Sequence, residues 1–139
     1  MRVYVDSSAL VKRSVDEAES EPLAAALDRY VADDAVLVSS SLAWIEVGRA
    51  LRTRLGSGSY GEGEIHDAVE GALSGVAERL ITGDVVGLAR RVAPPTLRTL
   101  GAVHLATAIL LDVDVVVAYD DRLLDACRHN GLAAATPGR

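Results

Sequence analysis

Acidic residues that follow two predicted strands are the side chains of this sequence best suited to chemistry. Asp6 follows the run VYV, and Asp120 and Asp121 follow the run VVVAY. Glu46 lies in the stretch SSLAWIEVGRAL, where most neighbours are apolar. A carboxylate on or beside a buried helix face is costly unless it is paired or holds a metal ion. We therefore expect these acids to outline one cluster.

Such a cluster suits a hard divalent cation, Mg²⁺ or Mn²⁺, because these ions prefer oxygen ligands and keep several waters. Two carboxylates within ~5 Å repel each other by roughly 3 kcal/mol at an effective dielectric constant of about 20. A divalent ion turns that repulsion into attraction. The bound water can then attack a phosphodiester while the ion stabilises the developing charge. The pattern is typical of metal-dependent phosphodiester hydrolysis.

Each of these residues also has a simpler structural interpretation. Asp6 before SSAL and Asp120 before DRLLDA both have the sequence context of a helix N-cap. Glu46 alone could be a half-exposed surface residue. His104 is interpreted as a core histidine rather than a metal ligand.

The elements that must position these acids alternate along the chain. Short β-branched runs predict strands at 3–5, 36–39, 78–82, 114–119 and 133–136. Helical patterns lie between them, at 7–15, 21–32, 41–55, 64–75, 85–93, 100–111 and 121–130. This order predicts an α/β fold with a mostly parallel sheet. In such sheets the ligand site lies outside the carboxyl ends of the strands, where Asp6 and Asp120 are expected.

Polar residues and glycines mark the boundaries of several predicted helices. The predicted N-caps are Ser7 or Ser8, Ser40 or Ser41, and Asp84. The stretch GSGSYGEG, residues 56–63, interrupts the helical pattern. Our hypothesis is that 56–63 forms a mobile loop near the substrate groove.

Length and composition limit the class of protein. The chain has 139 residues, so we predict a single domain over 1–139. A net charge of −6 argues against coating nucleic acid by bulk attraction, although acids that hold a metal ion remain compatible with it. The single Cys127 excludes an internal disulfide and suits a reducing cytosol. The pattern of a signal peptide or membrane span is absent, so we expect a cytoplasmic protein without membrane association.

Four stretches together resemble the PIN-domain family, and within it the VapC-type toxins of type II toxin–antitoxin systems. These are VYVDSSALVKR, VSSSLAWIEVGRAL, LRTLGAVHLATAILL and DVVVAYDDRLLDACRHNGLAAATPG. The resemblance implies a PIN-like α/β/α sandwich and metal-dependent endoribonuclease activity on RNA, typically tRNA or rRNA. It also implies Mg²⁺ or Mn²⁺ as cofactor, a VapB-type antitoxin that blocks the groove, and a toxin homodimer.

The resemblance also implies roles for individual residues. Ser7 or Ser8 matches the hydroxyl residue that follows the first aspartate and steadies its carboxylate without binding the metal. Asp121 is a neighbour of the acid that follows the fourth strand. The catalytic and metal-binding acids, matched by position, are Asp6, Glu46 and Asp120.

One position departs from the family pattern. The family stretch resembles L-D-A-x-H-L-A-T-A, and this chain has LGAVHLATA, with Gly101 where the aspartate is expected. One hypothesis is an active ribonuclease whose metal binding is weakened by ~2–4 kcal/mol on the Coulomb scale above. A second is a PIN-fold module that binds antitoxin or RNA but cuts poorly. A third is that an aspartate was replaced to reduce toxicity.

Basic side chains near these motifs are candidates for binding RNA phosphates. They are Lys12, Arg13, Arg49, Arg52 and Arg98.

Overall fold

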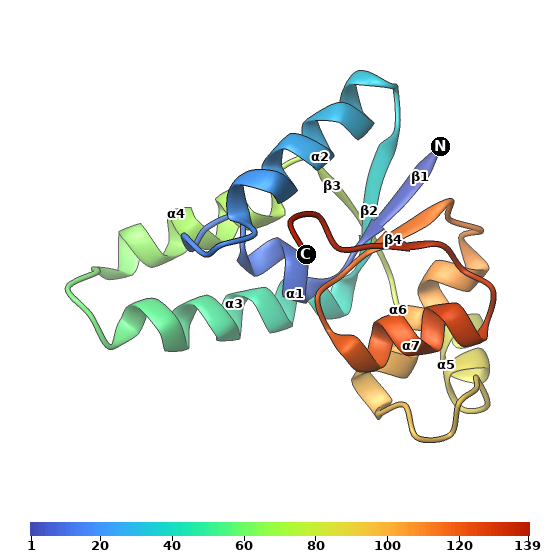
Figure 1. Cartoon of the computed structure of the whole chain (residues 1–139). Coiled ribbons are helices and arrows are strands. Elements are labelled where there is room, and N and C mark those ends of the chain that lie inside the picture. Colours follow the sequence, from blue (N-terminus) through green and yellow to red (C-terminus); the bar gives the residue numbers. More distant parts are fainter.

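The computed structural model describes residues 1–139 and contains one sheet of five strands (Figure 1). The strands are β1 (Arg2–Val5), β2 (Val36–Ser40), β3 (Val76–Arg79), β4 (Val115–Val117) and β5 (Ala134–Ala135). They lie in the order β3-β2-β1-β4-β5, and every pair is parallel. The predicted sheet is therefore confirmed. β3 begins two residues before the predicted 78–82 and ends at Arg79.

Seven helices connect the strands. They are α1 (Ser7–Val11), α2 (Ser20–Ala32), α3 (Ser41–Gly56), α4 (Glu62–Leu73), α5 (Gly83–Ala89), α6 (Thr99–Leu110) and α7 (Asp121–His129). None of them has the length and apolar character that crossing a membrane requires.

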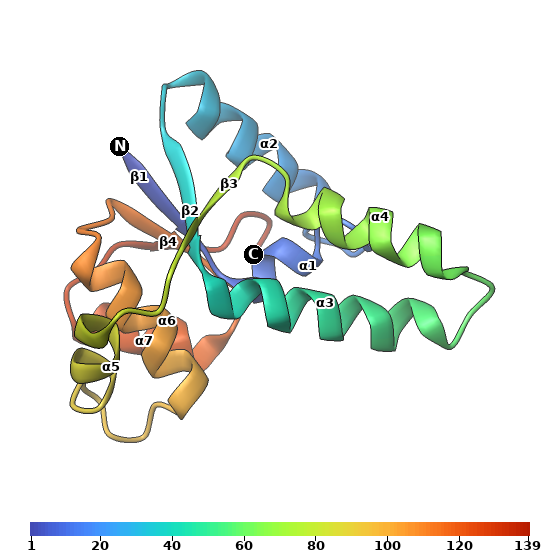
Figure 2. The same cartoon turned by 180° about the vertical axis from the view of Figure 1, so that it is seen from behind.

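The two faces of the sheet carry separate hydrophobic cores. Val3 and Val5 of β1 pack into a cluster with residues of α1, α2, α3 and α4. Tyr4, between them, belongs to a second cluster with residues of α6 and α7. Adjacent strand residues point to opposite faces, so buried runs such as VYV supply both cores. Figures 1 and 2 show the resulting layers, and the α/β/α sandwich is confirmed.

Two of the predicted helix caps differ from the structure. Asp6 rather than Ser7 or Ser8 is the N-cap of α1, because its extended backbone lets its side chain accept from the Ser8 N–H, and this confirms the alternative interpretation of Asp6 as a cap. Ser40 caps α3 as predicted. The α5 cap is Thr82, whose hydroxyl accepts from the Val85 N–H.

Some predicted lengths were also wrong. α1 ends at Val11 rather than at 15, and α5 ends at Ala89 rather than at 93. The predicted interruption at 56–63 is a loop only at 57–61, because α3 ends at Gly56 and α4 begins at Glu62. This loop lies at the tip of the hairpin formed by the two helices, away from the sheet (Figure 1). No residue of this loop lines the main cavity, so its predicted place near the groove is wrong.

The connection order places β1 and β4 side by side at the centre of the sheet. β2 and β3 lie on one side of β1, in chain order, and β4 then pairs with the other side of β1. Val5 pairs with Val117, and the Asp6 N–H donates to the Val117 carbonyl at 2.9 Å. This reversal is the topological switch point at which open parallel sheets form ligand sites.

Candidate active site

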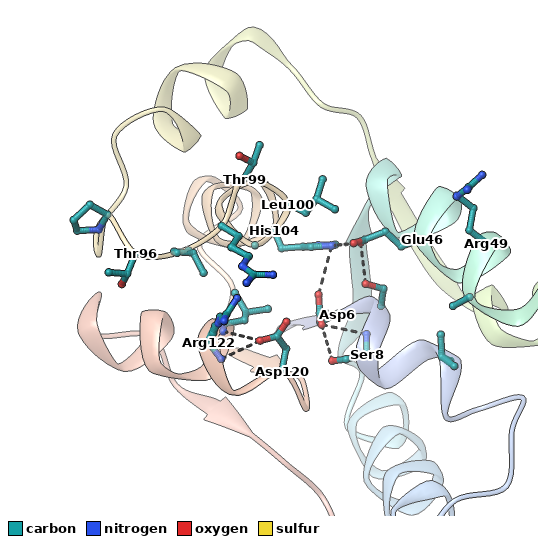
Figure 3. Close-up of a pocket in the computed structure, with 18 residues that line it drawn as sticks. Asp6, Ser8, Glu46, Arg49, Thr96, Thr99, Leu100, His104, Asp120 and Arg122 are labelled. Atoms are coloured by element: carbon teal, nitrogen blue, oxygen red, sulfur yellow. Dashed lines mark hydrogen bonds and ion pairs between the residues drawn. The ribbon is translucent and has the colours of Figure 1, made fainter. Parts of the chain in front are cut away.

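A cavity of about 1130 Å³ lies at the carboxyl ends of β1 and β4 (Figure 3). The three acids predicted from the sequence, Asp6, Glu46 and Asp120, all line it. Gly101 and His104 line it from α6. The structure therefore brings the predicted acids to one surface, although they come from three separate parts of the chain.

Asp6 is both a helix cap and a cavity residue. It is buried, with 4 % of its surface exposed. Its Oδ2 accepts from the Ser8 N–H at 3.1 Å and from Ser8 Oγ at 2.6 Å. Ser8 Oγ also accepts from the Tyr119 N–H at 2.9 Å, which ties this carboxylate to the end of β4. The other oxygen, Oδ1, lies 3.5 Å from His104 Nε2.

Asp120 combines the same two roles. Its Oδ1 accepts from the backbone N–H groups of Arg122 and Leu123 at 2.9 and 3.3 Å, which caps α7. Asp120 is exposed and keeps its second oxygen free of protein hydrogen bonds. Asp121 lies outside the cavity lining and pairs with Arg139 at 2.7 Å. The two aspartates thus differ, although they are adjacent in sequence.

Glu46 is half-buried on α3, and its Oε1 has two donors. Ser7 Oγ donates to this oxygen at 2.9 Å, and His104 Nε2 lies 2.5 Å from it. Burial alone would raise the pKa of Glu46. The hydrogen bond and the charge of His104 outweigh burial, so the pKa of Glu46 is lowered. Glu46 is therefore ionised at neutral pH. The two serines therefore hold different acids: Ser8 donates to Asp6, and Ser7 donates to Glu46.

His104, interpreted from the sequence as a core histidine, lines the cavity and contacts one of its acids. Its burial, 2 % exposed, agrees with the interpretation as a core histidine. Its partners are Tyr4 Oη, at 2.6 Å from Nδ1, and the acid Glu46. Burial lowers the pKa of His104, but the hydrogen bond to Glu46 and the charge of Asp6 outweigh it and raise the pKa. A polar residue in the otherwise apolar stretch AVHLA was the available signal.

Gly101, at the position where the resemblance predicts an acid, lines the cavity. A Cβ added to Gly101 would lie 2.9 Å from Leu97 Cδ1 and 3.4 Å from Leu97 Cγ. Leu97 therefore occupies space that a larger residue at 101 would need. The acids that line the cavity are Asp6, Glu46 and Asp120, so no other acid of the lining replaces the one expected at residue 101.

The acids that line the cavity are of the chemical type that binds a divalent cation. Three carboxylates line one cavity, and carboxylate oxygen is the ligand that Mg²⁺ and Mn²⁺ prefer. Asp120 and Glu46 each keep one oxygen free of protein hydrogen bonds. In the conformation described, no three acidic, histidine or cysteine side chains lie close enough together to hold an ion. Binding would therefore require these side chains to move closer together.

The basic candidates separate into two groups. Arg49 and Arg98 line the cavity, together with Arg122, which the sequence reasoning did not select. The other three have partners elsewhere: Lys12 pairs with Glu17 and Glu19, Arg13 donates to the Ala72 and Ser74 carbonyls, and Arg52 pairs with Glu62. Arg122 is the second residue of α7, and its backbone N–H donates to the capping Asp120.

Comparison with known proteins agrees with this architecture. The PIN domain family model matches residues 3–129. Ribonuclease VapC46 of Mycobacterium tuberculosis is 41% identical over 137 residues, covering 97% of this chain and 97% of the relative. Ribonuclease VapC47 of the same species is 33% identical over 138 residues, covering 98% and 97%.

Solved structures share the fold at lower identity. VapC20 of M. tuberculosis, a Sarcin-Ricin loop cleaving toxin, has a TM-score of 0.67 and 18% identity, covering 89% of this chain and 94% of its own. VapBC2 of Rickettsia felis, bound to a DNA fragment from the promoter, has a TM-score of 0.72 and 10% identity, covering 97% and 98%. The chain belongs to the PIN-domain family, in its VapC group.

Proposed function

We propose that this chain is the toxin of a VapBC-type toxin–antitoxin pair and acts as an endoribonuclease. One observation carries the proposal: Asp6 and Asp120, which follow adjacent parallel strands, line the same cavity as Glu46 in a chain 41% identical to a VapC ribonuclease. Residues 1–139 act as one PIN domain in this proposal.

The cofactor proposed is Mg²⁺ or Mn²⁺, and Asp6, Glu46 and Asp120 form the catalytic and metal-binding set. Such an ion, when bound, polarises the phosphate and lowers the pKa of a coordinated water. Asp6 and Asp120 would hold the ion directly, each through the oxygen that does not cap its helix. Glu46 orients the attacking water through its free oxygen. Its lowered pKa favours accepting a hydrogen bond over removing a proton.

The substrate proposed is RNA, with tRNA or rRNA as the class. The cavity combines carboxylates with Arg49, Arg98 and Arg122. A guanidinium offers a planar fork of donors that matches phosphate oxygens. These three side chains neutralise the RNA backbone beside the acids, whereas the net charge of −6 keeps the remaining surface unfavourable to RNA. The solved relative VapC20 cleaves the sarcin-ricin loop, which is consistent with an rRNA substrate.

The partner proposed is a VapB-type antitoxin, and the toxin itself is proposed to form a homodimer. The R. felis VapBC2 structure, which covers 97% of this chain, supports a partner of this class. Blocking the cavity would require the antitoxin to enter between the carboxylates and the arginines that line it.

A catalytically impaired module is the second candidate, and two observations favour it. Gly101 lacks the carboxylate expected there, and no three potential ligands are gathered for an ion. In this alternative the fold still binds antitoxin or RNA but cuts slowly.

The deciding experiment measures cleavage of a tRNA and rRNA pool with and without Mn²⁺. The unaltered chain is compared with Asp6→Asn, Gly101→Asp and the control Asp125→Asn, which makes the same change on the exposed side of α7. Asn keeps an oxygen that can cap α1. We expect metal-dependent cleavage by the unaltered chain and the control, and its loss in Asp6→Asn.

Each other outcome has a defined meaning. Cleavage by Gly101→Asp alone would support the impaired module. Cleavage that survives Asp6→Asn would remove the proposed site. Absence of cleavage by every chain, including Gly101→Asp with saturating Mn²⁺, would contradict the ribonuclease proposal.

A further inference from the structure

A chain of hydrogen bonds runs from the sheet to Glu46 through two buried side chains. The Ser40 N–H donates to the Tyr4 hydroxyl at 3.2 Å, and this hydroxyl lies 2.6 Å from His104 Nδ1. His104 Nε2 lies 2.5 Å from Glu46 Oε1, and Figure 3 shows the ring pointing at that carboxylate. Tyr4 and His104 are 0 % and 2 % exposed. The chemistry proposed above uses neither of them.

The direction of the protons follows from what each group can donate. An ionised carboxylate only accepts, so Nε2 of His104 must carry the proton that it shares with Glu46. The Tyr4 oxygen already accepts from the Ser40 N–H, which leaves its own O–H available to donate to Nδ1. In the neutral ring, Tyr4 therefore selects the tautomer that has its proton on Nε2.

Both donors to Glu46 meet at one oxygen. Ser7 Oγ and His104 Nε2 share Oε1, and Oε2 has no protein partner. A glutamate side chain has several rotamers, and fixing one of them has an entropic cost. Two donors on one oxygen fix the carboxylate and leave Oε2 free for a water or substrate group. The same Nε2 lies 3.5 Å from Asp6 Oδ1, so the imidazole N–H also reduces repulsion between these two acids.

We propose that His104 is a positioning residue for Glu46 and that Tyr4 sets its tautomer. The inference rests on the proposed function, since it concerns the orientation of the acid that faces the attacking water. His104 acts through Glu46 and does not touch substrate. It lies three residues after Gly101 on α6, on the helix that lacks the expected acid. The site thus has an imidazole N–H donor near the position where the resemblance predicts an additional carboxylate.

The experiment uses the full chain with three substitutions and one control. His104→Leu removes both hydrogen bonds, and His104→Gln restores an N–H donor toward Glu46. Tyr4→Phe removes only the group that sets the tautomer. Tyr119→Phe is the matched control, because it deletes another buried tyrosine hydroxyl, one that donates to the Pro137 carbonyl instead. Melting temperature, kcat and KM are measured for each variant on the RNA pool with saturating Mn²⁺.

If His104 positions Glu46, its substitution should lower kcat by more than the change in melting temperature explains. We expect His104→Leu to lower kcat by about 10–100-fold with KM changed by less than about threefold, the range typical of groups that orient a metal site. His104→Gln should recover most of this loss at a similar melting temperature, and Tyr4→Phe should lie between the two. Tyr119→Phe should keep the kcat of the unaltered chain. Equal kcat values for His104→Leu and His104→Gln, or an unchanged kcat in His104→Leu, would overturn the proposal.

A spectroscopic readout separates this proposal from the ribonuclease proposal. In a ¹H–¹⁵N spectrum of the metal-free chain we expect a slowly exchanging proton on Nε2 of His104, shifted downfield. Glu46→Gln should move this resonance upfield. If no chain cleaves RNA, the ribonuclease proposal fails and the spectrum alone decides the role of His104. A ring with a bare Nε2 would overturn the positioning role whatever the activity is.

Discussion

Leu97 lies directly over Gly101, with its Cδ1 only 2.9 Å from the place that a Cβ at residue 101 would take. Leu97 therefore fills part of the space that the aspartate expected at residue 101 would need. The contact involves the far end of a flexible side chain, so Leu97 can move when residue 101 becomes larger. The change Gly101→Asp, alone and together with a smaller residue at 97, therefore tests the roles of both residues.

Gly101→Asp should bind Mn²⁺ at least about tenfold more tightly than the unaltered chain, because a fourth carboxylate joins the cavity. The double change with Leu97→Ala should bind more tightly still, since the aspartate then needs no displacement. Electron paramagnetic resonance of free Mn²⁺ measures both affinities. Gly63→Asp is the control, because Gly63 is also in the first turn of a helix and has open space around it. Equal affinities in all four chains would contradict a metal site beside Gly101.

Ser8→Ala should destabilise the fold more than Ser7→Ala. Ser8 Oγ donates to Asp6 and accepts from the Tyr119 N–H, so its loss leaves a backbone donor without that partner. Such a loss costs about 1–3 kcal/mol in the free energy of unfolding. Ser7 Oγ has only Glu46 as its partner, and that carboxylate keeps His104. Urea unfolding of both variants measures the difference, and equal midpoints would contradict it.

Arg49→Ala should weaken RNA binding, whereas Arg52→Ala should leave it nearly unchanged. The two residues lie three positions apart on α3, and each change removes one positive charge. Arg49 lines the cavity, and Arg52 pairs with Glu62 outside it. Fluorescence anisotropy of a labelled RNA, in an Asp6→Asn background that prevents cleavage, measures the affinity. The slope of log K against log salt should fall by about 0.7 for Arg49→Ala, as expected for one lost phosphate contact on a single strand. Identical slopes for the two variants would place the RNA elsewhere.

Cys127 should resist alkylation in the folded chain. It is buried, and burial raises the pKa of its thiol from 9.0 to about 11. The thiolate is the reactive form, so at pH 8 its fraction falls about 100-fold below that of a thiol with the ordinary pKa. The rate with iodoacetamide should rise about tenfold per pH unit and increase sharply after unfolding. Mass spectrometry follows the reaction in native buffer and in urea. Fast alkylation at pH 7 without unfolding would contradict the packing of α7 against the sheet.

The raised pKa of the Cys127 thiol also makes the stability of the fold depend on pH. The unfolded thiol, with a pKa of 9.0, ionises before the folded one, with a pKa of about 11. The unfolded chain therefore releases a proton first, and the contribution of Cys127 to stability is lost as the pH rises above 9.0. Cys127→Ala should show a smaller loss of melting temperature between pH 8 and pH 10 than the unaltered chain.

The sequence by itself determined the sheet and the placement of the acids at its carboxyl ends. Short β-branched runs alternating with helical patterns are local signals, and a parallel sheet follows from their order. Asp6 and Asp120 follow β1 and β4 directly, so their position at the ends of those strands needed no tertiary information. Because a carboxylate has two oxygens, the caps that these residues form leave one oxygen of each for the proposed site.

Only the tertiary structure decided which side chains hold which acids. Ser7 and Glu46 are 39 residues apart, and His104 and Glu46 are 58 apart. Such pairs depend on how α1, α3 and α6 pack at the ends of the sheet and on the rotamers that packing permits, and sequence spacing carries neither. The same packing set Leu97 over Gly101 and directed Arg122 into the cavity while it left Arg52 outside. Local patterns therefore placed the acids, and long-range packing chose their hydrogen-bond partners.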